Sequence, residues 1–265
     1  MYAFDYHKPS SVQEAASLLA SKEDATIVAG GQTLIPTLKH RLAQPTDLID
    51  LSGVAELKGI KMDGDTLVIG AMTTHAEVSA DATVRSAIPA LADLADGIGD
   101  AQVRNCGTIG GSVSNNDPAA DYPAALLALS ATVVTTNRSI SADDFFTGMF
   151  DTALEPGEIV TEIRFPKPAR AAYAKFPNPA SRYAIVGVMV AESGGQVRVA
   201  VTGAGQEGVF RATEIEQALS GTFSADTAKA AKVAPDTMSA DIHASADYRA
   251  HLVSVMASRA VAACS

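Results

Sequence analysis

The chain begins with a segment whose apolar residues repeat with the period of a helix. Ser11 and Glu14 have the spacing of a capping box, which is typical of a helix N-terminus. Apolar residues then recur three and four positions apart, at Val12, Ala15, Ala16 and Leu19. This pattern predicts an amphipathic helix close to the start of the chain.

The residues that follow change to short apolar runs, which are typical of strands. Ala25 to Ala29 and Asp47 to Leu51 are two such runs. Between them, Leu34 to Leu42 is compatible with a helix, because Pro36 would lie in its first turn. The first run ends in Gly30-Gly31-Gln32-Thr33. We therefore expect a strand–helix–strand unit with a glycine turn at the carboxyl end of its first strand.

An antiparallel hairpin is predicted next. The tight-turn sequence Asp63-Gly64-Asp65 separates two apolar runs, Leu57 to Met62 and Thr66 to Ala71. Helical and extended patterns then alternate, with helices expected at His75–Ser79, Pro89–Asp96 and Tyr122–Leu129 and strands at Thr132–Thr136 and Glu158–Phe165. Residues 1–165 are therefore expected to form an α+β domain.

Two prolines in three residues mark a boundary between domains. Pro166-Lys167-Pro168-Ala169-Arg170 indicates a stiff linker, because proline fixes the backbone and removes hydrogen-bond donors. Strands are expected after it at Ala184–Glu192 and Gln196–Thr202, followed by helices. The last helix has a packing stripe of Tyr248, Leu252, Val255, Met256, Ala260 and Ala263. Residues 166–265 are therefore expected to form a second, smaller α+β domain.

Composition and charge exclude several classes of protein. The 265 residues include 30 Asp and Glu against 20 Lys and Arg, which gives a formal net charge of −10. Such a chain repels a phosphate backbone, so nucleic-acid binding is not expected. Apolar runs such as Ala184 to Ala191 are far shorter than the ~20 residues that span a bilayer. With no basic segment before an apolar one at the start, we expect a cytoplasmic protein.

The residue types that bind metals are scattered along the chain. Cys106 and Cys264 are too few to hold an iron–sulfur cluster. The histidines, at positions 7, 40, 75, 243 and 251, have no partner at metal-ligand spacing. The Gly-x-Ser-x-Gly elbow of serine hydrolases does not occur. We therefore assign no metal site and no catalytic side chain.

One glycine-rich segment matches the dinucleotide-binding fingerprint. Gly203-Ala204-Gly205-Gln206-Glu207-Gly208 has the required spacing and follows a predicted strand. The fingerprint should open directly into a helix, whereas Val209-Phe210 intervenes here. A plain strand-to-helix loop is the preferred interpretation.

Two Gly-Gly turns have a composition suited to an anion. Gly30-Gly31 and Gly110-Gly111 lie among hydroxyl and amide residues, which include Thr33, Thr108 and Ser112. Consecutive glycines let backbone N–H groups converge on an anion without interference from a Cβ. The two turns could clamp a diphosphate, and two ordinary turns fit the composition equally well.

Two carboxylates follow the second turn. Asp117 precedes Pro118, which is typical of a helix N-cap with proline at the first helical position. Asp121 has no such explanation, and a single carboxylate is well suited to accept hydrogen bonds from ribose hydroxyls. We expect Asp117 to be structural and Asp121 to be functional.

Several ordered segments together resemble one known family. They are Ala29 to Pro36, Arg41 to Pro45, Ile69 to Thr73, Thr108 to Ser112 and Asp117 to Asp121, with Val209 to Ala212 and Tyr248 to Leu252 in the second domain. The chain resembles the FAD-binding medium subunits of molybdenum hydroxylases, of the carbon monoxide dehydrogenase type. The resemblance implies a two-part FAD-binding domain of the vanillyl-alcohol-oxidase or PCMH type over residues 1–165.

The resemblance also implies the residues of a flavin site. The diphosphate would lie at two loops, formed by Ala29, Gly30, Gly31, Gln32, Thr33 and Leu34 and by Thr108, Ile109, Gly110, Gly111 and Ser112. Asp121, with Asp117 nearby, would bind the ribose side, and Ile98, Ile159, Val160 and Tyr183 would contact or cover the flavin ring. Some relatives have His in place of Gln32 and Lys near Pro177, so charge compensation of the diphosphate would be weaker or arranged differently.

By the same resemblance, the chain is one subunit of an oxidoreductase complex. It would bind FAD non-covalently, while a large partner subunit holds the molybdenum cofactor and a small one holds two [2Fe-2S] clusters. A dimer of heterotrimers is expected, and the FAD would pass electrons to an external acceptor. Two alternatives are a stand-alone flavin oxidase of the wider superfamily and a non-catalytic subunit that has lost its flavin.

Overall fold

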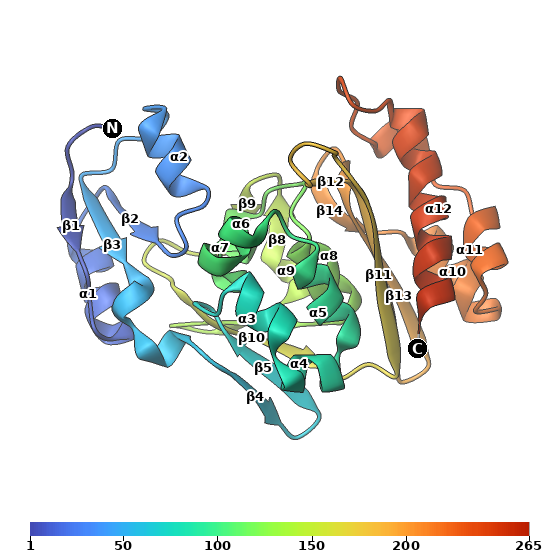
Figure 1. Cartoon of the computed structure of the whole chain (residues 1–265), viewed down its shortest axis with the longest axis horizontal. Helices are drawn as coiled ribbons and strands as arrows, with labels where there is room; N and C mark the ends of the chain where they lie inside the picture. The colour runs from blue at the N-terminus through green and yellow to red at the C-terminus, as the bar shows by residue number, and fades with distance from the viewer. Residues whose placement is uncertain (265) are drawn as a thin grey trace.

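The N-terminal lobe of the molecule is a small parallel sheet with helices beside it. The structure is a computed structural model that describes residues 1–264. The lobe contains β1 (Asp5–His7), α1 (Val12–Ser21), β2 (Ala25–Val28), α2 (Leu34–Lys39) and β3 (Asp47–Asp50), followed by two 3-10 turns to Leu57. The strand order is β1-β3-β2, and all pairs are parallel (Figure 1). The predicted strand–helix–strand unit is present, although α2 ends at Lys39 rather than at Leu42.

The first helix is capped by Ser11 as predicted, but the second bond of a capping box is shifted by one residue, because Glu14 bonds the N–H of Ser10 rather than that of Ser11. The Ser11 hydroxyl accepts a hydrogen bond from the Glu14 N–H at 3.1 Å, and the Glu14 carboxylate accepts one from the Ser10 N–H at 2.8 Å. These bonds satisfy backbone donors that a helix leaves free at its start. The helix then buries Ala15 against Ile49 of the central strand β3.

The middle lobe is an antiparallel sheet covered by short helices. The sheet order is β4-β5-β10-β6-β7, formed by Ile60–Asp63, Thr66–Gly70, Val160–Pro166, Thr132–Thr135 and Ser139–Ser141. The helices are α3 (His75–Ala80), α4 (Ala82–Ala87), α5 (Pro89–Asp96), α6 (Ala101–Cys106), α7 (Ile109–Asn115), α8 (Tyr122–Ala128) and α9 (Ala142–Phe145), and a small hairpin pairs β8 (Phe146–Gly148) with β9 (Asp151–Thr152). The hairpin predicted around Gly64 joins β4 and β5 as expected.

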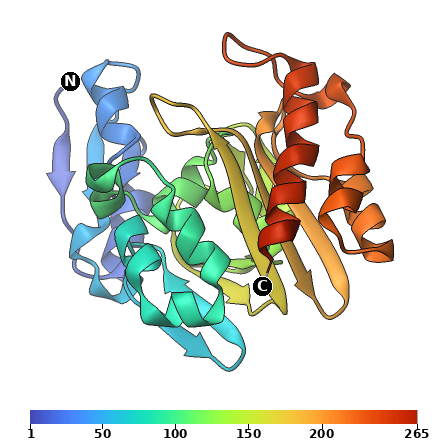
Figure 2. The same ribbon diagram turned by 45° about the vertical axis from the view of Figure 1, so that its right-hand side comes forward.

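The C-terminal domain is an antiparallel sheet between two layers. Its order is β11-β12-β13-β14, formed by Arg170–Pro177, Ala184–Ser193, Gln196–Gly205 and Gly208–Arg211. One face is covered by α10 (Thr213–Gly221), α11 (Ala225–Ala230) and α12 (Ala246–Ala263), as Figure 2 shows. Met189 and Ala191 on the other face join the core of the middle lobe. Both faces of β12 are therefore buried, which explains its continuous apolar run.

The predicted α+β class and the antiparallel sheet of the second domain are confirmed, but several elements differ from expectation. Pro166 belongs to β10, and β11 already begins at Arg170, so only residues 167–169 connect the two sheets. The segment Gly203 to Gly208 is a β-hairpin between β13 and β14, and the strand-to-helix interpretation is wrong. Thr108 to Ser112 is the N-cap and first turn of α7 rather than a loop.

The stripe predicted on the last helix is only partly correct. Leu252, Met256 and Ala260 are buried, whereas Tyr248 and Ala263 are exposed. The buried face of the helix includes Arg249 instead, and its guanidinium donates to the Ile185 and Gly203 carbonyl oxygens at 2.7 Å each. A charged residue therefore occupies part of the packing face because it satisfies backbone acceptors of the sheet.

A buried threonine joins the two domains. The Thr202 hydroxyl on β13 donates to the Pro118 and Ala120 carbonyl oxygens, at 3.0 and 2.6 Å. The Gly203 N–H also donates to the Pro118 oxygen at 2.8 Å. The C-terminal sheet thus fixes the backbone of residues 118–120, which precedes Asp121.

We predict that Thr202→Val lowers the free energy of unfolding by about 1–3 kcal/mol, because the Ala120 carbonyl oxygen loses its donor and the Pro118 oxygen keeps only that of Gly203. Urea denaturation followed by circular dichroism measures the change. Thr222→Val, at an exposed position in the same domain, is the control and should change stability by less than ~0.5 kcal/mol. Equal stability of the two variants would contradict the role given to Thr202.

Candidate functional site

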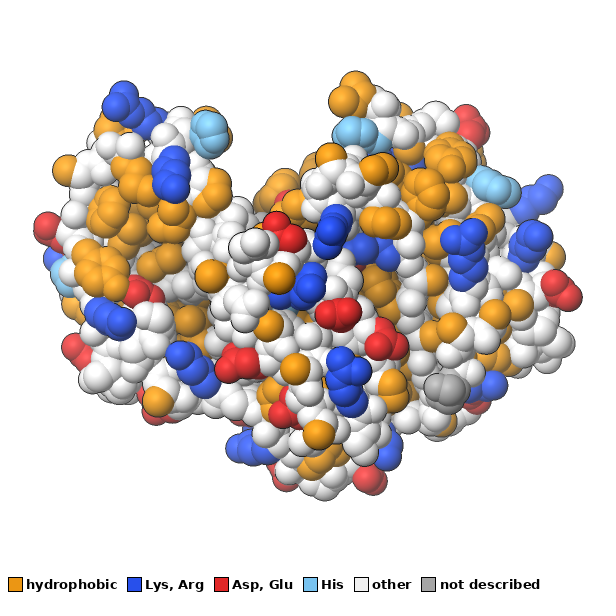
Figure 3. All heavy atoms as spheres, viewed as in Figure 1, with side chains coloured by type: hydrophobic (Ala, Val, Ile, Leu, Met, Phe, Trp, Pro, Cys, Tyr) orange, Lys and Arg blue, Asp and Glu red, His pale blue; other side chains and the backbone are white. Residues whose placement is uncertain are grey.

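A cavity of about 660 Å³ lies where the N-terminal lobe, the middle lobe and the β11–β12 turn meet. Figure 3 shows the molecule hollowed between the N-terminal lobe and the remainder. The volume lies within the usual range of ligand pockets, about 300–1,000 Å³. Every predicted site residue lines the cavity except Ile109, which is buried in the core of the middle lobe.

The first glycine turn offers free backbone donors to the cavity. Among the described residues, no protein acceptor bonds the N–H groups of Gly30, Gly31, Gln32 and Thr33. Gly31 has a φ of +72°, in the left-handed region that glycine adopts readily. Four consecutive unpaired N–H groups at the wall of a cavity are suited to an anionic group.

Gly30 is required for a close approach of two backbones. A Cβ at this position would collide with the carbonyl oxygen of Cys106 and lie 2.7 Å from the Cα of Gly107. The turn therefore packs directly on the end of α6. A larger residue at Gly30 would force the two lobes apart, so its first effect is on packing rather than on the space for a ligand.

The second glycine turn differs from the first because its donors are already used. The N–H groups of Ile109 and Gly110 donate to the Thr73 and Ala71 carbonyl oxygens, at 3.0 and 2.9 Å. The Gly111 N–H donates to the hydroxyl of Thr108, which caps the helix. The two turns therefore offer different groups to the cavity. This turn supplies small side chains and hydroxyl groups instead.

A turn of the C-terminal domain closes another side of the cavity. Ser181, Arg182 and Tyr183 line it from the connection between β11 and β12. Arg182 donates to the Gly99 carbonyl oxygen of the middle lobe at 3.1 Å, which anchors this turn. Burial raises the pKa of the Tyr183 hydroxyl, and the nearby carboxylates of Asp117 and Asp121 add to the shift.

Asp121 is buried and held by two residues of the C-terminal domain. Its carboxylate accepts a hydrogen bond from the Tyr173 hydroxyl and forms an ion pair with Lys175, whose Nζ lies 3.0 Å away. Lys175 also donates to the Gly97 carbonyl oxygen at 2.8 Å. Burial raises the pKa of the Asp121 carboxyl, and the Lys175 ammonium opposes that shift.

Asp117 is not a helix cap, and that prediction is wrong. Its Oδ1 accepts a hydrogen bond from the Ala119 N–H at 2.8 Å within a turn, and the next helix begins only at Tyr122. The chain turns here because Thr202 holds the Pro118 and Ala120 carbonyl oxygens. Asp117 lines the cavity together with Asp121.

Several residues of the cavity wall were not predicted. They include Ala71, Met72, His75, Gly99, Val103, Leu154, Glu158, Ser181 and Arg182. The polar cluster Thr73-Thr74-His75 at the end of β5 was a usable signal, because His75 follows a helix cap at the end of a buried strand. Arg182 carried no comparable signal, since its role depends on a contact between domains.

His75 is the buried titratable group of this wall. Its side chain is about 4% exposed, and its ring lies 5.4 Å from that of Tyr122. The Nδ1 of His75 and the hydroxyl of Tyr122 are both buried without a partner among the described residues. Burial lowers the pKa of His75 to about 4, and the Arg104 charge contributes to the shift. The imidazole is therefore neutral near pH 7.

The described residues hold no group of three or more His, Cys, Asp or Glu side chains arranged for a metal ion. No described helix is both long and apolar enough to cross a membrane.

Two family models together match nearly the whole chain. Residues 2–168 match the FAD binding domain in molybdopterin dehydrogenase, and residues 171–264 match the CO dehydrogenase flavoprotein C-terminal domain. The chain belongs to this family of FAD-binding medium subunits. It is therefore a flavoprotein component of the molybdenum hydroxylase type of oxidoreductase.

Known members of the family align over almost their full length. The chain is 37% identical to the carbon monoxide dehydrogenase medium chain of Hydrogenophaga pseudoflava, covering 97% of this chain and 96% of that protein. It is also 37% identical to the nicotine 6-hydroxylase medium subunit of Paenarthrobacter nicotinovorans, with 98% and 96% covered. The structure of a reconstituted CO dehydrogenase from Oligotropha carboxidovorans superposes with a TM-score of 0.88 at 35% identity, covering 98% and 97%.

The cavity of this medium subunit fits FAD. The unpaired N–H groups of residues 30–33 suit its diphosphate, and the largely apolar wall at Ile98, Ile159 and Val160 suits an aromatic ring system.

We predict that His75 makes stability depend on pH. Because its folded pKa of about 4 lies below the ordinary value of 6.5, the unfolded chain takes up the proton first, and stability falls as the pH drops from about 6.5 to about 4. The His75 contribution over this range is on the order of 2–3 kcal/mol. Melting temperatures measured between pH 7 and pH 5 should fall less steeply for His75→Phe than for the parent chain. His251→Gln, at an exposed position, should keep the parent slope, and a parent slope in His75→Phe would count against this assignment.

Proposed function

We propose that the chain binds one FAD non-covalently, with the diphosphate at the first glycine turn. The observation that carries the proposal is the row of unpaired N–H groups at Gly30, Gly31, Gln32 and Thr33 on the wall of the cavity. The hydroxyls of Thr108 and Ser112 add neutral donors from the second turn. Gly110 lets this turn pack closely on the middle lobe, because a Cβ there would lie 2.7 Å from the Ala71 carbonyl oxygen.

We propose that the flavin ring lies toward Ile98, Ile159, Val160 and Tyr183. Three of these are aliphatic residues that exclude water, and Tyr183 belongs to the turn anchored by Arg182. Asp121 would accept hydrogen bonds from the ribose hydroxyls, since each of its oxygens has a second lone pair. Bound FAD supplies the redox chemistry, and these residues position it and exclude water.

We infer that the chain works as one subunit of a larger complex. The names of its relatives describe medium chains and medium subunits, including those of carbon monoxide dehydrogenase and nicotine 6-hydroxylase. In the proposed complex, a large subunit carries the molybdenum cofactor, and a small subunit passes electrons through [2Fe-2S] clusters to this FAD and on to an external acceptor. A dimer of heterotrimers is the proposed assembly. Cys106 and Cys264 are free thiols, which suits the reducing cytoplasm.

The first prediction of this proposal is a non-covalent flavin. The purified chain, loaded with FAD, should release the flavin into the supernatant when the protein is precipitated with acid. Absorbance of the supernatant in the flavin bands measures the release. Flavin that stays with the pellet would indicate a covalent bond, and a chain that FAD cannot load would contradict the proposal.

The second prediction concerns the two acids of the cavity. Asp121→Asn should weaken FAD binding about ten- to a hundredfold, because a charged hydrogen bond to the ribose is lost. Asp117→Asn should change the affinity much less. Lys175→Met tests whether the loss comes only from breaking the ion pair, and it should retain more affinity than Asp121→Asn. Fluorescence titration of FAD measures all three, and a larger loss for Asp117→Asn would reverse the assignment.

The third prediction is that turnover requires partner subunits. Organic substrates should not reduce the FAD-loaded chain at a useful rate. We assign it no catalytic side chain and no metal ion that would activate water or a carbon atom of the substrate. Anaerobic mixing with carbon monoxide, aldehydes or N-heterocycles, followed at the flavin bands, measures reduction. Rapid substrate-dependent bleaching by this chain alone would favour the stand-alone oxidase.

A further inference from the structure

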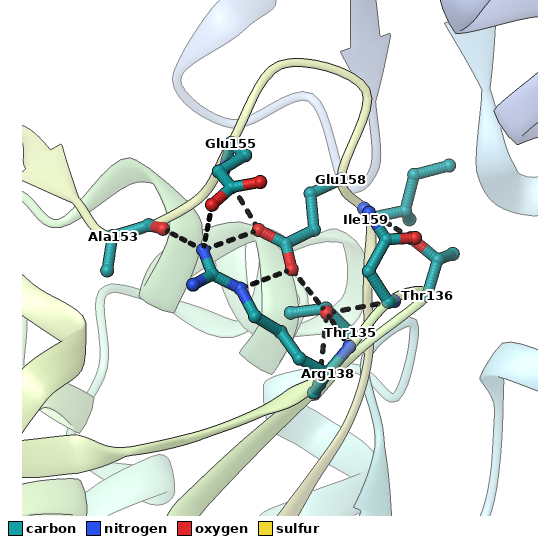
Figure 4. Close-up of polar contacts among 8 residues, drawn as sticks. Thr135, Thr136, Arg138, Ala153, Glu155, Glu158 and Ile159 are labelled. Atoms are coloured by element: carbon teal, nitrogen blue, oxygen red, sulfur yellow. Dashed lines mark hydrogen bonds and ion pairs between the residues drawn. The ribbon is translucent and has the colours of Figure 1, made fainter.

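The side chain of Glu158 is a fully buried carboxylate beside the ring end of the cavity. It accepts hydrogen bonds from the Thr135 hydroxyl at 2.7 Å and from the Glu155 N–H at 2.8 Å. The guanidinium of Arg138 donates to both of its oxygens, from Nε at 3.0 Å and from Nη2 at 3.2 Å. Figure 4 shows these contacts. The carboxylate therefore accepts four hydrogen bonds, which use its lone pairs.

These bonds join three segments that are separate in the sequence. Thr135 is the last residue of β6 and Arg138 lies in the turn before β7, and the Thr135 N–H donates to the Arg138 carbonyl oxygen. Arg138 also donates to the Ala153 carbonyl oxygen at 2.6 Å, in the segment that leads to Glu155. Glu158 itself precedes β10. One carboxylate thus fixes a hairpin turn, a loop and the start of a central strand.

The residue after Glu158 is held on both of its backbone polar groups. The Ile159 N–H donates to the Thr136 hydroxyl at 3.2 Å, and the Ile159 carbonyl oxygen accepts from the Thr136 N–H at 2.9 Å (Figure 4). The pairing of β10 with β6 then shifts register between Val160 and Glu162. Such a bulge redirects the strand and the side chains next to it. The position of Ile159 and Val160 therefore depends on the hydrogen bonds that hold Glu158.

The charges around this carboxylate keep it ionised. Arg138 is the cation in contact with it, and the Glu155 carboxylate lies 3.3 Å from Nη2 of the same guanidinium. The bonds from Arg138, Glu155 and Thr135 hold the pKa of Glu158 at about 2. The group therefore stays charged at neutral pH and has no free position from which to bind a ligand.

We propose that Glu158 is a positioning residue for the flavin, which acts by fixing the backbone of Ile159 and Val160 against the ring. The proposal rests on the proposed function, because it takes the bound ring to be that of FAD. Its physical basis is that a charged hydrogen-bond network within a rigid sheet holds adjacent wall residues to a fraction of an ångström. Arg138 and Thr135 act through Glu158 and do not touch the ring.

The C-terminal domain contains a matched control. Glu216 is also buried, and it accepts two hydrogen bonds from Arg211, at 2.8 and 2.7 Å, and one from the Val199 N–H at 2.9 Å. It does not line the cavity. Glu158→Gln and Glu216→Gln remove the same charge from similar surroundings, so both should lower the melting temperature, and only the first should change the flavin.

The test compares FAD affinity and the flavin spectrum in the two variants. Fluorescence titration should give a dissociation constant about tenfold higher for Glu158→Gln, the change that corresponds to ~1.4 kcal/mol. The visible absorption and circular dichroism bands of bound FAD should also shift. Glu216→Gln should keep the parent affinity and spectrum. An unchanged spectrum and affinity in Glu158→Gln, or an equal change in Glu216→Gln, would overturn the proposal.

A milder pair of variants covers the case in which Glu158→Gln does not fold. Arg138→Lys keeps the positive charge but loses the fork of donors, and Arg138 is about 41% exposed, so the chain should tolerate the change. Arg211→Lys is its control. Arg138→Lys should alter the flavin bands and Arg211→Lys should not, and the reverse pattern would count against Glu158. A parent chain that binds no FAD would instead contradict the proposed function itself.

Discussion

The site depends on a contact between two backbones. The N-terminal lobe and the middle lobe share no β-sheet, and they approach each other where Gly30 packs against Cys106 and Gly107. No side chain larger than hydrogen fits at Gly30 without moving one lobe, because its Cβ would overlap a carbonyl oxygen. At this point the approach of the two lobes is limited by peptide groups, while the side chains of Met72 and Ile159 pack in the core of the N-terminal lobe. This contact holds the free N–H groups of the first glycine turn in position.

The two glycine turns solve different problems despite their similar sequences. The first leaves its N–H groups unpaired, which burial would penalise unless they face water or an anion. The second begins a helix whose first donors are taken by Ala71, Thr73 and Thr108, so it is rigid and already satisfied. The first turn has free N–H groups and the second does not, so an anionic ligand is attracted most strongly to the first turn. That asymmetry would fix the direction in which an extended dinucleotide lies.

The sequence predicted local features well and long-range ones poorly. The helix cap at Ser11, the hairpin at Gly64 and the helix Pro89–Asp96 rest on residues close together in the chain, and all are present. Asp117 was misassigned because its cap pattern competes with Thr202, which lies in another domain. The ion pair between Lys175 and Asp121 likewise joins residues far apart in the sequence. The same holds for the bond between Arg138 and Glu158, and no spacing rule describes such contacts. The resemblance to a family supplied the cavity residues, since composition left the glycine turns ambiguous.

The C-terminal domain matches a family model of its own, yet it contributes part of the cavity. Lys175 and Tyr173 hold Asp121, Thr202 holds the turn before it, and Arg182 anchors the turn that carries Tyr183. A chain cut near residue 168 would keep every glycine of the site but lose one wall. Exchange of C-terminal domains between related medium subunits would therefore change one wall of the cavity and leave the two glycine turns unchanged. Recombination between relatives at the boundary of the two domains would therefore be tolerated only where these four contacts survive.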